Sequence, residues 1–216
     1  MKVVNFSQSD SIDNKFIAEL RDVNIQNDRT RFRRNVERIG EVNAYEVSRT
    51  LHYEGTTVTT PLGVAEVNLP SDQIVAGTIL RAGLPLHNGV LNVFDDAENA
   101  FVSAYRKYDD EINFDIHIEY IASPILDGKV LILTDPMLAT GGSMELAYEA
   151  LLTKGTPEKV HIISIIASRE AVDYVSEHFP EDTTLWVGAI DEFLDPHKYI
   201  IPGLGDAGDL CYGERE

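Results

Sequence analysis

The chain has very little cysteine and no long apolar run. Its 216 residues include one cysteine, Cys211, so no disulfide bond can form within the chain, and this usage is typical of a reducing compartment. No apolar stretch approaches the roughly 20 residues of a membrane span. The start of the sequence, MKVVNFSQSD, also lacks the apolar core of a signal peptide. We therefore expect a cytoplasmic protein.

Basic residues are scarce relative to acidic ones. The sequence has 18 Lys and Arg against 36 Asp and Glu, which gives a formal net charge of −18. Such a charge repels nucleic acid and anionic membranes, so neither is an expected partner. A phosphate group would have to be bound locally, by backbone N–H groups and a few well-placed arginines.

One basic cluster departs from this balance. It consists of Arg29, Arg31, Arg33, Arg34 and Arg38, within a stretch of helical spacing. One interpretation is a solvated helix face in a subunit interface. The other is an anion site, such as a site for a regulatory nucleotide. The sequence leaves both interpretations open.

The sequence also lacks the spacing of a metal site. Its histidines are scattered, at His52, His87, His117, His161, His178 and His197. Zinc sites need Cys and His ligands at short, regular intervals. We therefore expect no metal ion held by the protein alone.

What the sequence does have is 44% apolar residues, arranged in short runs between helical stretches. The expected strands are 73–80, 129–134, 159–167 and 185–190, with a further pair at 100–108 and 113–122. The expected helices are 13–22, 28–40, 85–94, 143–154 and 169–178. Continuous apolar strands that alternate with helices are typical of an α/β fold, a mainly parallel sheet flanked by helices. No linker divides the chain, so we expect one domain over 1–216.

Two local features accompany this pattern. Gly40 is a helix-stop signal at the end of the second expected helix. Residues 45–60 are rich in Thr, Val and Tyr and predict a β-hairpin, with its turn at Glu54-Gly55.

The strongest functional signal is VLILTDPMLATGGSMELAYEALL, residues 130–152. A buried strand leads to Thr140-Gly141-Gly142-Ser143, which opens a helix. Bare glycine backbone at a helix N-terminus exposes N–H groups where the helix dipole favours negative charge. This pattern predicts a monophosphate cradle. It is not a P-loop, because no lysine follows the glycines.

Asp135 lies at the end of the same strand. A carboxylate there can accept hydrogen bonds from the vicinal hydroxyls of a ribose whose 5′-phosphate occupies the cradle. In parallel sheets, ligands bind beyond the carboxyl ends of the strands, where this loop lies.

The stretch TDPMLATGGS resembles the 5-phosphoribosyl pyrophosphate (PRPP) motif of type I phosphoribosyltransferases. Pro136 stands where most of them have a second acidic residue, a departure typical of the uracil phosphoribosyltransferases. Two further stretches agree, ILRAGL (79–84) and YIIPGLGDAGD (199–209). The resemblance implies the type I fold with a small β-hood at about 101–121. It also implies pyrimidine salvage, in which uracil and PRPP give UMP and pyrophosphate.

The resemblance also implies site residues. It assigns PRPP binding to Arg81, Arg106, Asp135, Pro136, Met137, Leu138, Ala139, Thr140, Gly141, Gly142, Ser143 and Asp206. It assigns uracil to the loop at 199–209, at Ile200, Gly205, Asp206 and Ala207, and catalytic roles to Asp135, Asp206 and Arg106. Further implications are Mg²⁺ bound mainly through PRPP, GTP as an effector, and a homodimer or larger homo-oligomer.

Three alternatives are weighed against this interpretation. The first is a dinucleotide site, since Gly203 to Gly208 fit G-x-G-x-x-G, but the sequence ends at Glu216 and leaves no room for the helix and acidic residue that must follow. The second is a regulator of the same fold that senses UMP and binds RNA, against which the net charge speaks. The third is a phosphoribosyltransferase for another base.

Overall fold

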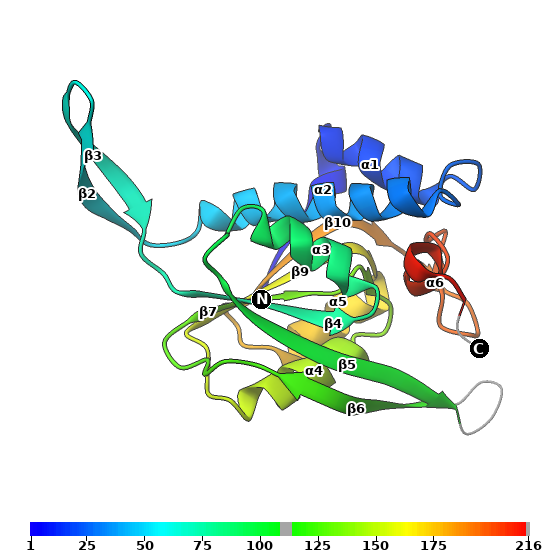
Figure 1. The fold of residues 1–216 in the computed structure, drawn as a ribbon. Coiled ribbons are helices and arrows are strands. Elements are labelled where there is room, and N and C mark those ends of the chain that lie inside the picture. The colour runs from blue at the N-terminus through cyan, green and yellow to red at the C-terminus, as the bar shows by residue number, and fades with distance from the viewer. Residues whose placement is uncertain (109–113, 215–216) are drawn as a thin grey trace.

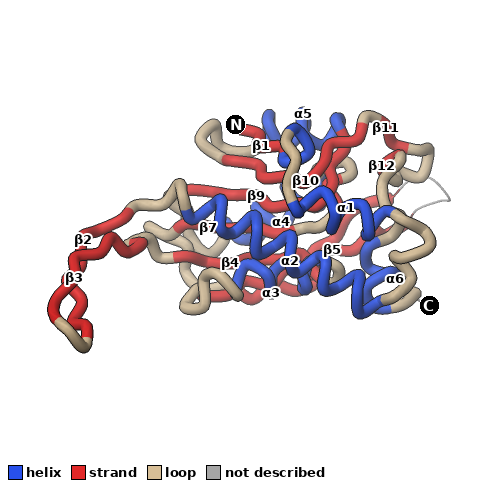
Figure 2. The backbone as a smooth tube through the Cα atoms, turned by 90° about the horizontal axis from the view of Figure 1, so that it is seen from above, coloured by secondary structure: helices blue, strands red, loops and turns tan. Residues whose placement is uncertain are grey.

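A central sheet with helices on both faces forms the body of the molecule (Figures 1 and 2). The computed structural model describes residues 1–108 and 114–214, and for 104–108 and 114–117 it describes the backbone alone. The strand order is β1-β10-β9-β7-β4-β5-β6, with β8 beside β9. Among these described strands, β5 and β6 pair antiparallel and every other pair is parallel.

The strands of this sheet are β1 (Lys2–Asn5), β4 (Ile74–Leu80), β5 (Glu98–Tyr108), β6 (Phe114–Ala122), β7 (Val130–Thr134), β8 (Met137–Leu138), β9 (Lys159–Ser168) and β10 (Thr184–Asp191). The helices are α1 (Ile12–Arg21), α2 (Arg29–Ser48), α3 (Gly83–Leu91), α4 (Gly142–Leu152), α5 (Arg169–His178) and α6 (Ala207–Tyr212), with a short 3₁₀ helix at Phe6–Gln8. Two small ribbons are added by β2 (Tyr53–Thr60) with β3 (Gly63–Pro70), and by β11 (Phe193–Leu194) with β12 (Ile200–Ile201). None of the described helices is long and apolar enough to cross a membrane.

Alternate residues of the central strands serve two separate cores. On β7, Ile132 packs in the core under α1, α2 and α3, while Leu131 and Leu133 pack in the core over α4 and α5. Because side chains on a strand alternate between faces, a strand buried on both sides must be apolar throughout. The prediction of a parallel sheet covered on both faces is confirmed.

Helix α2 continues through Gly40, so the predicted stop there is wrong. The glycine has a packing role, because a Cβ atom at Gly40 would lie 2.4 Å from the carbonyl oxygen of Leu86 on α3. On the other side of the contact, a Cβ atom at Gly89 would lie 2.1 Å from the carbonyl oxygen of Glu37. The two glycines let the backbones of α2 and α3 touch, which a local stop signal does not reveal.

We expect Gly89→Ala to destabilise the protein by about 3 kcal/mol, the upper end of the usual range for overpacked cores. In an uncrowded helix the same change stabilises, since alanine has the higher helix propensity. Urea unfolding measures the difference. The matched control is Gly63→Ala on β3, where no atom lies within 4 Å of the new methyl group. Equal stability of both variants would show that α2 and α3 are not in backbone contact.

The predicted hairpin exists, but its position is wrong. Residues 45–48 end α2, and the ribbon pairs Tyr53 with Pro70 and Thr60 with Gly63. Gly55 therefore lies within a strand, opposite Asn68. The ribbon stands away from the body of the molecule (Figure 1). Burial against the rest of the molecule therefore does not fix the position of its turn.

Strands β5 and β6 begin in the sheet and continue beyond it. β5 pairs with β4 as far as Leu80↔Ser103, whereas its pairing with β6 continues to Tyr108↔Phe114. Past Ser103 the two strands form a ribbon that extends from the edge of the body (Figure 1). This ribbon lies within the segment predicted as a hood. Its action as a hood stays a prediction, and residues 109–113 lie outside the described part of the chain.

A last correction concerns the C-terminal glycines. Helix α6, Ala207–Tyr212, begins within this pattern and contains Gly208, although the sequence predicts no room for a helix there. Its six residues fit because the side chain of Asp206 caps the helix by accepting the N–H of Asp209.

Candidate functional site

The structure brings the predicted site loops to one edge of the sheet. The loop before α3 follows β4, the loop before α4 follows β7, and both strands run parallel, so these loops lie beyond neighbouring carboxyl ends. The C-terminal loop and α6 lie at the same end of the molecule (Figure 1). The three stretches singled out in the sequence are therefore neighbours in space.

The loop between β7 and α4 is fixed from behind by β9. Met137 and Leu138 pair with β9, and the carbonyl oxygen of Pro136 accepts the N–H groups of Ile165 and Ile166, at 3.1 Å each. The hydroxyl of Ser168 donates to the carbonyl oxygen of Ala139 at 2.5 Å. These contacts give the loop between β7 and α4, the predicted phosphate loop, a defined shape. They do not use the amides at the start of α4.

Gly141 turns the chain into α4 with a φ of 88°. This left-handed conformation favours glycine. A side chain is also excluded by packing, since a Cβ atom at Gly141 would lie 2.6 Å from Cδ1 of Tyr174 on α5. Both constraints explain the first glycine of the motif, and the half-buried Gly142 then opens the helix.

Two helices begin without a side-chain cap, and both follow loops with residues that the resemblance assigns to PRPP. Among the described α-helices, four have a capping side chain, provided by Ser11, Asp28, Ser168 and Asp206. Helices α3 and α4 instead begin at Ala82 and Gly141, with no side-chain hydrogen bond to their first turns. First-turn N–H groups need an acceptor, which a ligand can supply. The structure thus leaves two uncapped helix ends, each able to accept an anion, beyond neighbouring strands.

Asp135 lies where β7 enters the phosphate loop. Its backbone N–H donates to the carbonyl oxygen of Ile163 at 3.1 Å, and its Oδ1 accepts the N–H of Met137 at 3.3 Å. The residue lines a small hollow together with Thr140 and Ser143. A carboxylate, two hydroxyl groups and helix amides therefore border one space.

Arg81 lies in the loop between β4 and α3 and contacts the C-terminal helix α6. Its Nη2 lies 3.2 Å from Oδ1 of Asp209, and its Nη1 lies 3.5 Å from the carbonyl oxygen of Gly213. The peptide bond between Leu80 and Arg81 is cis. The Arg81 side chain is 38% exposed, so the pair with Asp209 is partly solvated and worth little free energy. Arg81 is held in place and remains able to exchange partners.

The C-terminal loop presents mostly backbone. Gly203 and Gly205 have φ values of 57° and 93°, and the side chains of Ile200 and Ala207 are buried in the core. A ligand at these two buried residues would therefore meet peptide groups. Asp206 lies beside Arg81, since a Cβ atom at Gly208 would lie 3.1 Å from Asp206 Oδ1 and 3.5 Å from Arg81 Nη2.

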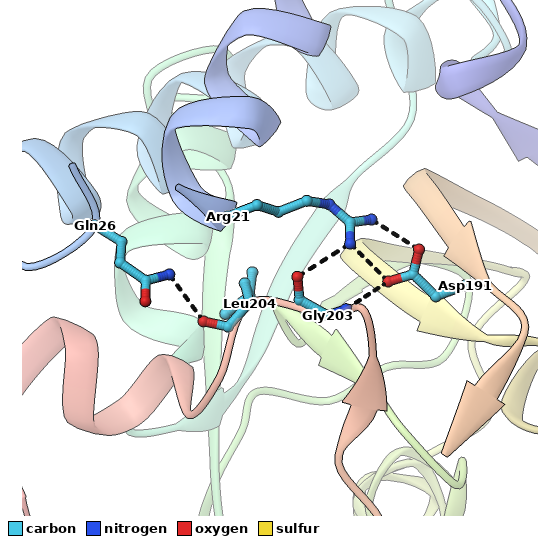
Figure 3. A network of polar contacts seen from close by, with 5 residues as sticks. All are labelled: Arg21, Gln26, Asp191, Gly203 and Leu204. Atoms are coloured by element: carbon cyan, nitrogen blue, oxygen red, sulfur yellow. Dashed lines mark hydrogen bonds and ion pairs between the residues drawn. The ribbon is translucent and has the colours of Figure 1, made fainter. Parts of the chain in front are cut away.

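The sequence reasoning missed the residues that hold this loop (Figure 3). Arg21 at the end of α1 forms a bidentate ion pair with Asp191, at 2.8 and 2.9 Å, and donates to the carbonyl oxygen of Gly203 at 3.0 Å. Gln26 donates to the carbonyl oxygen of Leu204 at 3.0 Å. No local pattern marks Arg21 or Gln26, because their partners are far away in the sequence.

The arginine cluster is largely paired within the chain. The partners are Glu19 for Arg31, Glu37 and Glu41 for Arg34, the ring of Phe16 for Arg38, and the carbonyl oxygen of Cys211 for Arg33. The hydrogen bond from Arg31 lowers the pKa of Glu19 to about 2. Arg29 lies next to Gly213. These pairings weaken the interpretation of the cluster as an anion site.

The predicted residues differ in how far the structure brings them together. The phosphate loop, Arg81 and Asp206 share one edge of the sheet, whereas Arg106 is placed only by its backbone, on β5 opposite Ile116.

Burial raises the pKa of Cys211 to about 12, so its thiol is not a nucleophile. In the described part of the chain, no group of three or more His, Cys, Asp or Glu side chains is placed to hold a metal ion.

Known proteins resemble this chain in sequence and in fold. A family model described as uracil phosphoribosyltransferase matches residues 8–214. The chain is 63% identical to a uracil phosphoribosyltransferase of Porphyromonas gingivalis over 215 residues, which cover 100% of both sequences. A solved structure of a protein from Aquifex aeolicus superposes with a TM-score of 0.87 at 32% identity, over 98% of each chain.

A more distant likeness concerns the fold alone. A hypoxanthine phosphoribosyltransferase of Staphylococcus aureus superposes with a TM-score of 0.50 at 12% identity, over 74% of each chain. It confirms the type I phosphoribosyltransferase fold that the sequence motifs imply.

Proposed function

The chain belongs to the uracil phosphoribosyltransferase family, and from this premise we propose that it transfers the 5-phosphoribosyl group of PRPP to N1 of uracil, giving UMP and pyrophosphate. One observation supports this most directly. Two uncapped helix N-termini and a glycine loop with an ordered backbone lie at the same edge of the sheet. The first two suit the two phosphate-bearing ends of PRPP, and the third suits a planar base.

In this proposal the phosphate loop binds the 5′-phosphate. The first-turn amides of α4 and the hydroxyls of Thr140 and Ser143 donate hydrogen bonds to it. Asp135 accepts hydrogen bonds from the ribose hydroxyls. Arg81 leaves Asp209 to bind the pyrophosphate, and the family resemblance assigns Arg106, a residue of β5, to the same group.

The chemical step is a substitution at the anomeric carbon. N1 of uracil forms a bond to this carbon as the bond to the pyrophosphate oxygen breaks, and the N1 proton passes to water. Catalysis comes mainly from holding the two reactants in line and from stabilising charge on the leaving group. Arg81 and Arg106 supply that stabilisation, while Asp135 and Asp206 lie on the ribose side.

Mg²⁺ neutralises charge on the pyrophosphate when it is bound. The donor set fits a metal that enters with PRPP, since Asp135 lies on a different loop from Asp206 and Asp209, and the described residues include no group of three or more metal ligands. These carboxylates would contact the metal-bearing substrate and would not form a resident metal site.

Three further proposals are made, the oligomer and the GTP response from the family resemblance and the location from the cysteine usage and the lack of long apolar runs. The protein forms a homodimer or larger homo-oligomer, acts in the cytoplasm, and responds to GTP. Light scattering at several concentrations tests the first, localisation of a tagged copy tests the second, and initial rates with and without GTP test the third.

The decisive experiment is a product assay. The protein is incubated with PRPP, Mg²⁺ and each of uracil, cytosine, adenine, guanine and hypoxanthine, and the nucleotide formed is identified. UMP from uracil alone supports the proposal. A nucleotide of another base, or none together with tight binding of a pyrimidine-operon leader RNA, would favour one of the alternatives.

We expect Asp135→Asn to lower kcat/KM for PRPP by about 100-fold with little change in stability. The amide keeps the shape and the acceptor for the Met137 N–H, but it loses the charge that strengthens hydrogen bonds from the ribose hydroxyls. Steady-state kinetics and thermal melting measure the two effects. Unchanged kcat/KM would remove Asp135 from the site.

A further inference from the structure

Gly203 in the C-terminal loop is hydrogen-bonded through both its N–H group and its carbonyl oxygen. The N–H of Gly203 donates to Oδ2 of Asp191 at 3.0 Å, and its carbonyl oxygen accepts from Nη1 of Arg21 at 3.0 Å. Arg21 and Asp191 are themselves paired, so the three residues form a closed ring of contacts (Figure 3). The exposed fractions of the two side chains are 22% and 9%, which places the pair largely out of solvent.

The next peptide is held by a separate side chain. Nε2 of Gln26 donates to the carbonyl oxygen of Leu204 at 3.0 Å and to that of Leu20 at 2.7 Å. The second bond ties the Gln26 amide to the end of α1. The position of the Leu204 oxygen is thus set by the N-terminal helices.

These contacts determine where the loop's N–H groups point. In a planar trans peptide the carbonyl oxygen and the N–H group point in opposite directions. The peptide between Leu204 and Gly205 is trans, and its oxygen faces Gln26, so the N–H of Gly205 points away from the Gln26 side chain. Gly205 is one of the residues predicted to bind uracil.

The loop needs such an external support. Glycines at 203 and 205 have φ values of 57° and 93°, a region where the absence of Cβ lets neighbouring peptide planes rotate at low cost. A Cβ atom at Gly205 would meet only Cδ1 of Leu210, at 3.8 Å, so packing does little to fix this residue. Hydrogen bonds from outside the loop must select one orientation.

We propose that Arg21, Asp191 and Gln26 are positioning residues for base recognition. They fix the peptide planes at Gly203 and Leu204 and so aim the N–H of Gly205 at an acceptor oxygen of the base. This inference rests on the proposed function, and it adds residues from α1 and the segment after it to a site built otherwise from carboxyl-end loops. The three side chains act through the loop and do not touch the base.

The first test compares Gln26→Leu with the wild type on uracil, 2-thiouracil and 4-thiouracil. Sulfur is a weak hydrogen-bond acceptor, so replacing the oxygen that Gly205 reads should already remove the contact in the wild type. We expect Gln26→Leu to lower kcat/KM for uracil about tenfold, through KM, the size of one well-placed hydrogen bond. For one of the two thio analogues the loss should fall to about twofold, and KM for PRPP should stay unchanged.

Asn24→Leu is the matched control for this variant. Asn24 lies in the same segment, and its side-chain amide donates to Asp22 and not to the loop. It should leave all three bases unaffected. An equal loss for uracil and both analogues, or an equal rise in KM for uracil and PRPP, would overturn the positioning role of Gln26.

The ion pair provides a second, independent test. Asp191→Asn keeps an acceptor for the Gly203 N–H but removes the charge that holds Arg21. Its control is Glu19→Gln. Glu19 on α1 forms a bidentate ion pair with Arg31, and this pair does not contact the C-terminal loop. We expect only Asp191→Asn to raise KM for uracil, by about tenfold. If both variants melt lower by the same amount and neither changes KM, the pair is structural and the proposal fails.

The two levels of inference fail differently. If the wild type forms no UMP, the proposed function fails, whatever the variants do. If the wild type forms UMP and the Gln26 and Asp191 variants keep the wild-type KM for uracil while remaining folded, the function stands and the positioning role falls.

Discussion

Gly142→Val is expected to abolish PRPP binding while the protein remains folded. Gly142 is the first residue of α4 and is not among the glycines with positive φ, so its backbone does not itself require glycine, and we expect the branched valine side chain to cover the first-turn N–H groups. The 5′-phosphate would lose these donors and meet two methyl groups. Isothermal titration calorimetry with PRPP and Mg²⁺ should show an affinity at least about 100-fold weaker, the loss of two charge-assisted hydrogen bonds.

The neighbouring glycine is unsuitable for this experiment. A side chain at Gly141 would clash with Tyr174 and occupy a left-handed backbone, so lost binding would not be separable from misfolding. The control is Ala150→Val, which places the same branched residue in the last turn of the same helix. It should melt at a similar temperature to Gly142→Val and bind PRPP normally. Wild-type affinity in folded Gly142→Val would place the phosphate elsewhere.

Cytosine is expected to be a far poorer substrate than uracil, by about 100- to 10,000-fold in kcat/KM. It replaces the O4 acceptor of uracil with an amino donor and the N3–H donor with a bare acceptor. A backbone loop cannot rotate an amide to suit, so each mismatch leaves a buried polar group unpaired, at about 1–3 kcal/mol. Competition between the two bases for limiting PRPP measures the ratio. Comparable values would mean that this loop does not read the base.

A paired substitution locates that selectivity in the loop. Gly205→Ala should lower uracil turnover, because the positive φ of 93° is unfavourable for alanine. The substitution would shift the peptide whose N–H group, that of residue 205, is proposed to contact the base. Gly128→Ala imposes the same kind of strain at a φ of 71°, in open space before β7. The two variants should lose similar stability, and only the first should change kcat/KM for uracil.

The parts of the site that the sequence predicted are those written in consecutive residues. The phosphate loop combines a buried strand, an aspartate and two glycines at a helix start, and each of these has a local meaning that the fold preserves. The predicted central strands 73–80, 129–134 and 159–167 correspond to β4, β7 and β9 for the same reason, since unbroken apolar runs of that length must be buried.

The parts that it missed depend on partners far away along the chain. Arg21 and Asp191 are 170 positions apart, and Gln26 is 178 positions from Leu204, so no window of sequence contains either contact. Gly40 was misread for the same reason. Judged from its neighbours in sequence, a glycine in a helical stretch indicates the end of the helix. Its actual role, close contact with the backbone of α3, depends on a helix that is distant in sequence.

The place of β1 in the sheet has a consequence for the order of events at the ribosome. This strand pairs with β10, Lys2 beside Thr184 and Asn5 beside Val187. Amino-terminal segments emerge first during synthesis. The pairing of β1 must therefore wait until β10 has been made, and the contacts of Arg21 and Gln26 must wait for Gly203 and Leu204, which follow β10. The nascent chain can thus form the loop between β7 and α4 before Arg21 and Gln26 have the C-terminal loop that they hold.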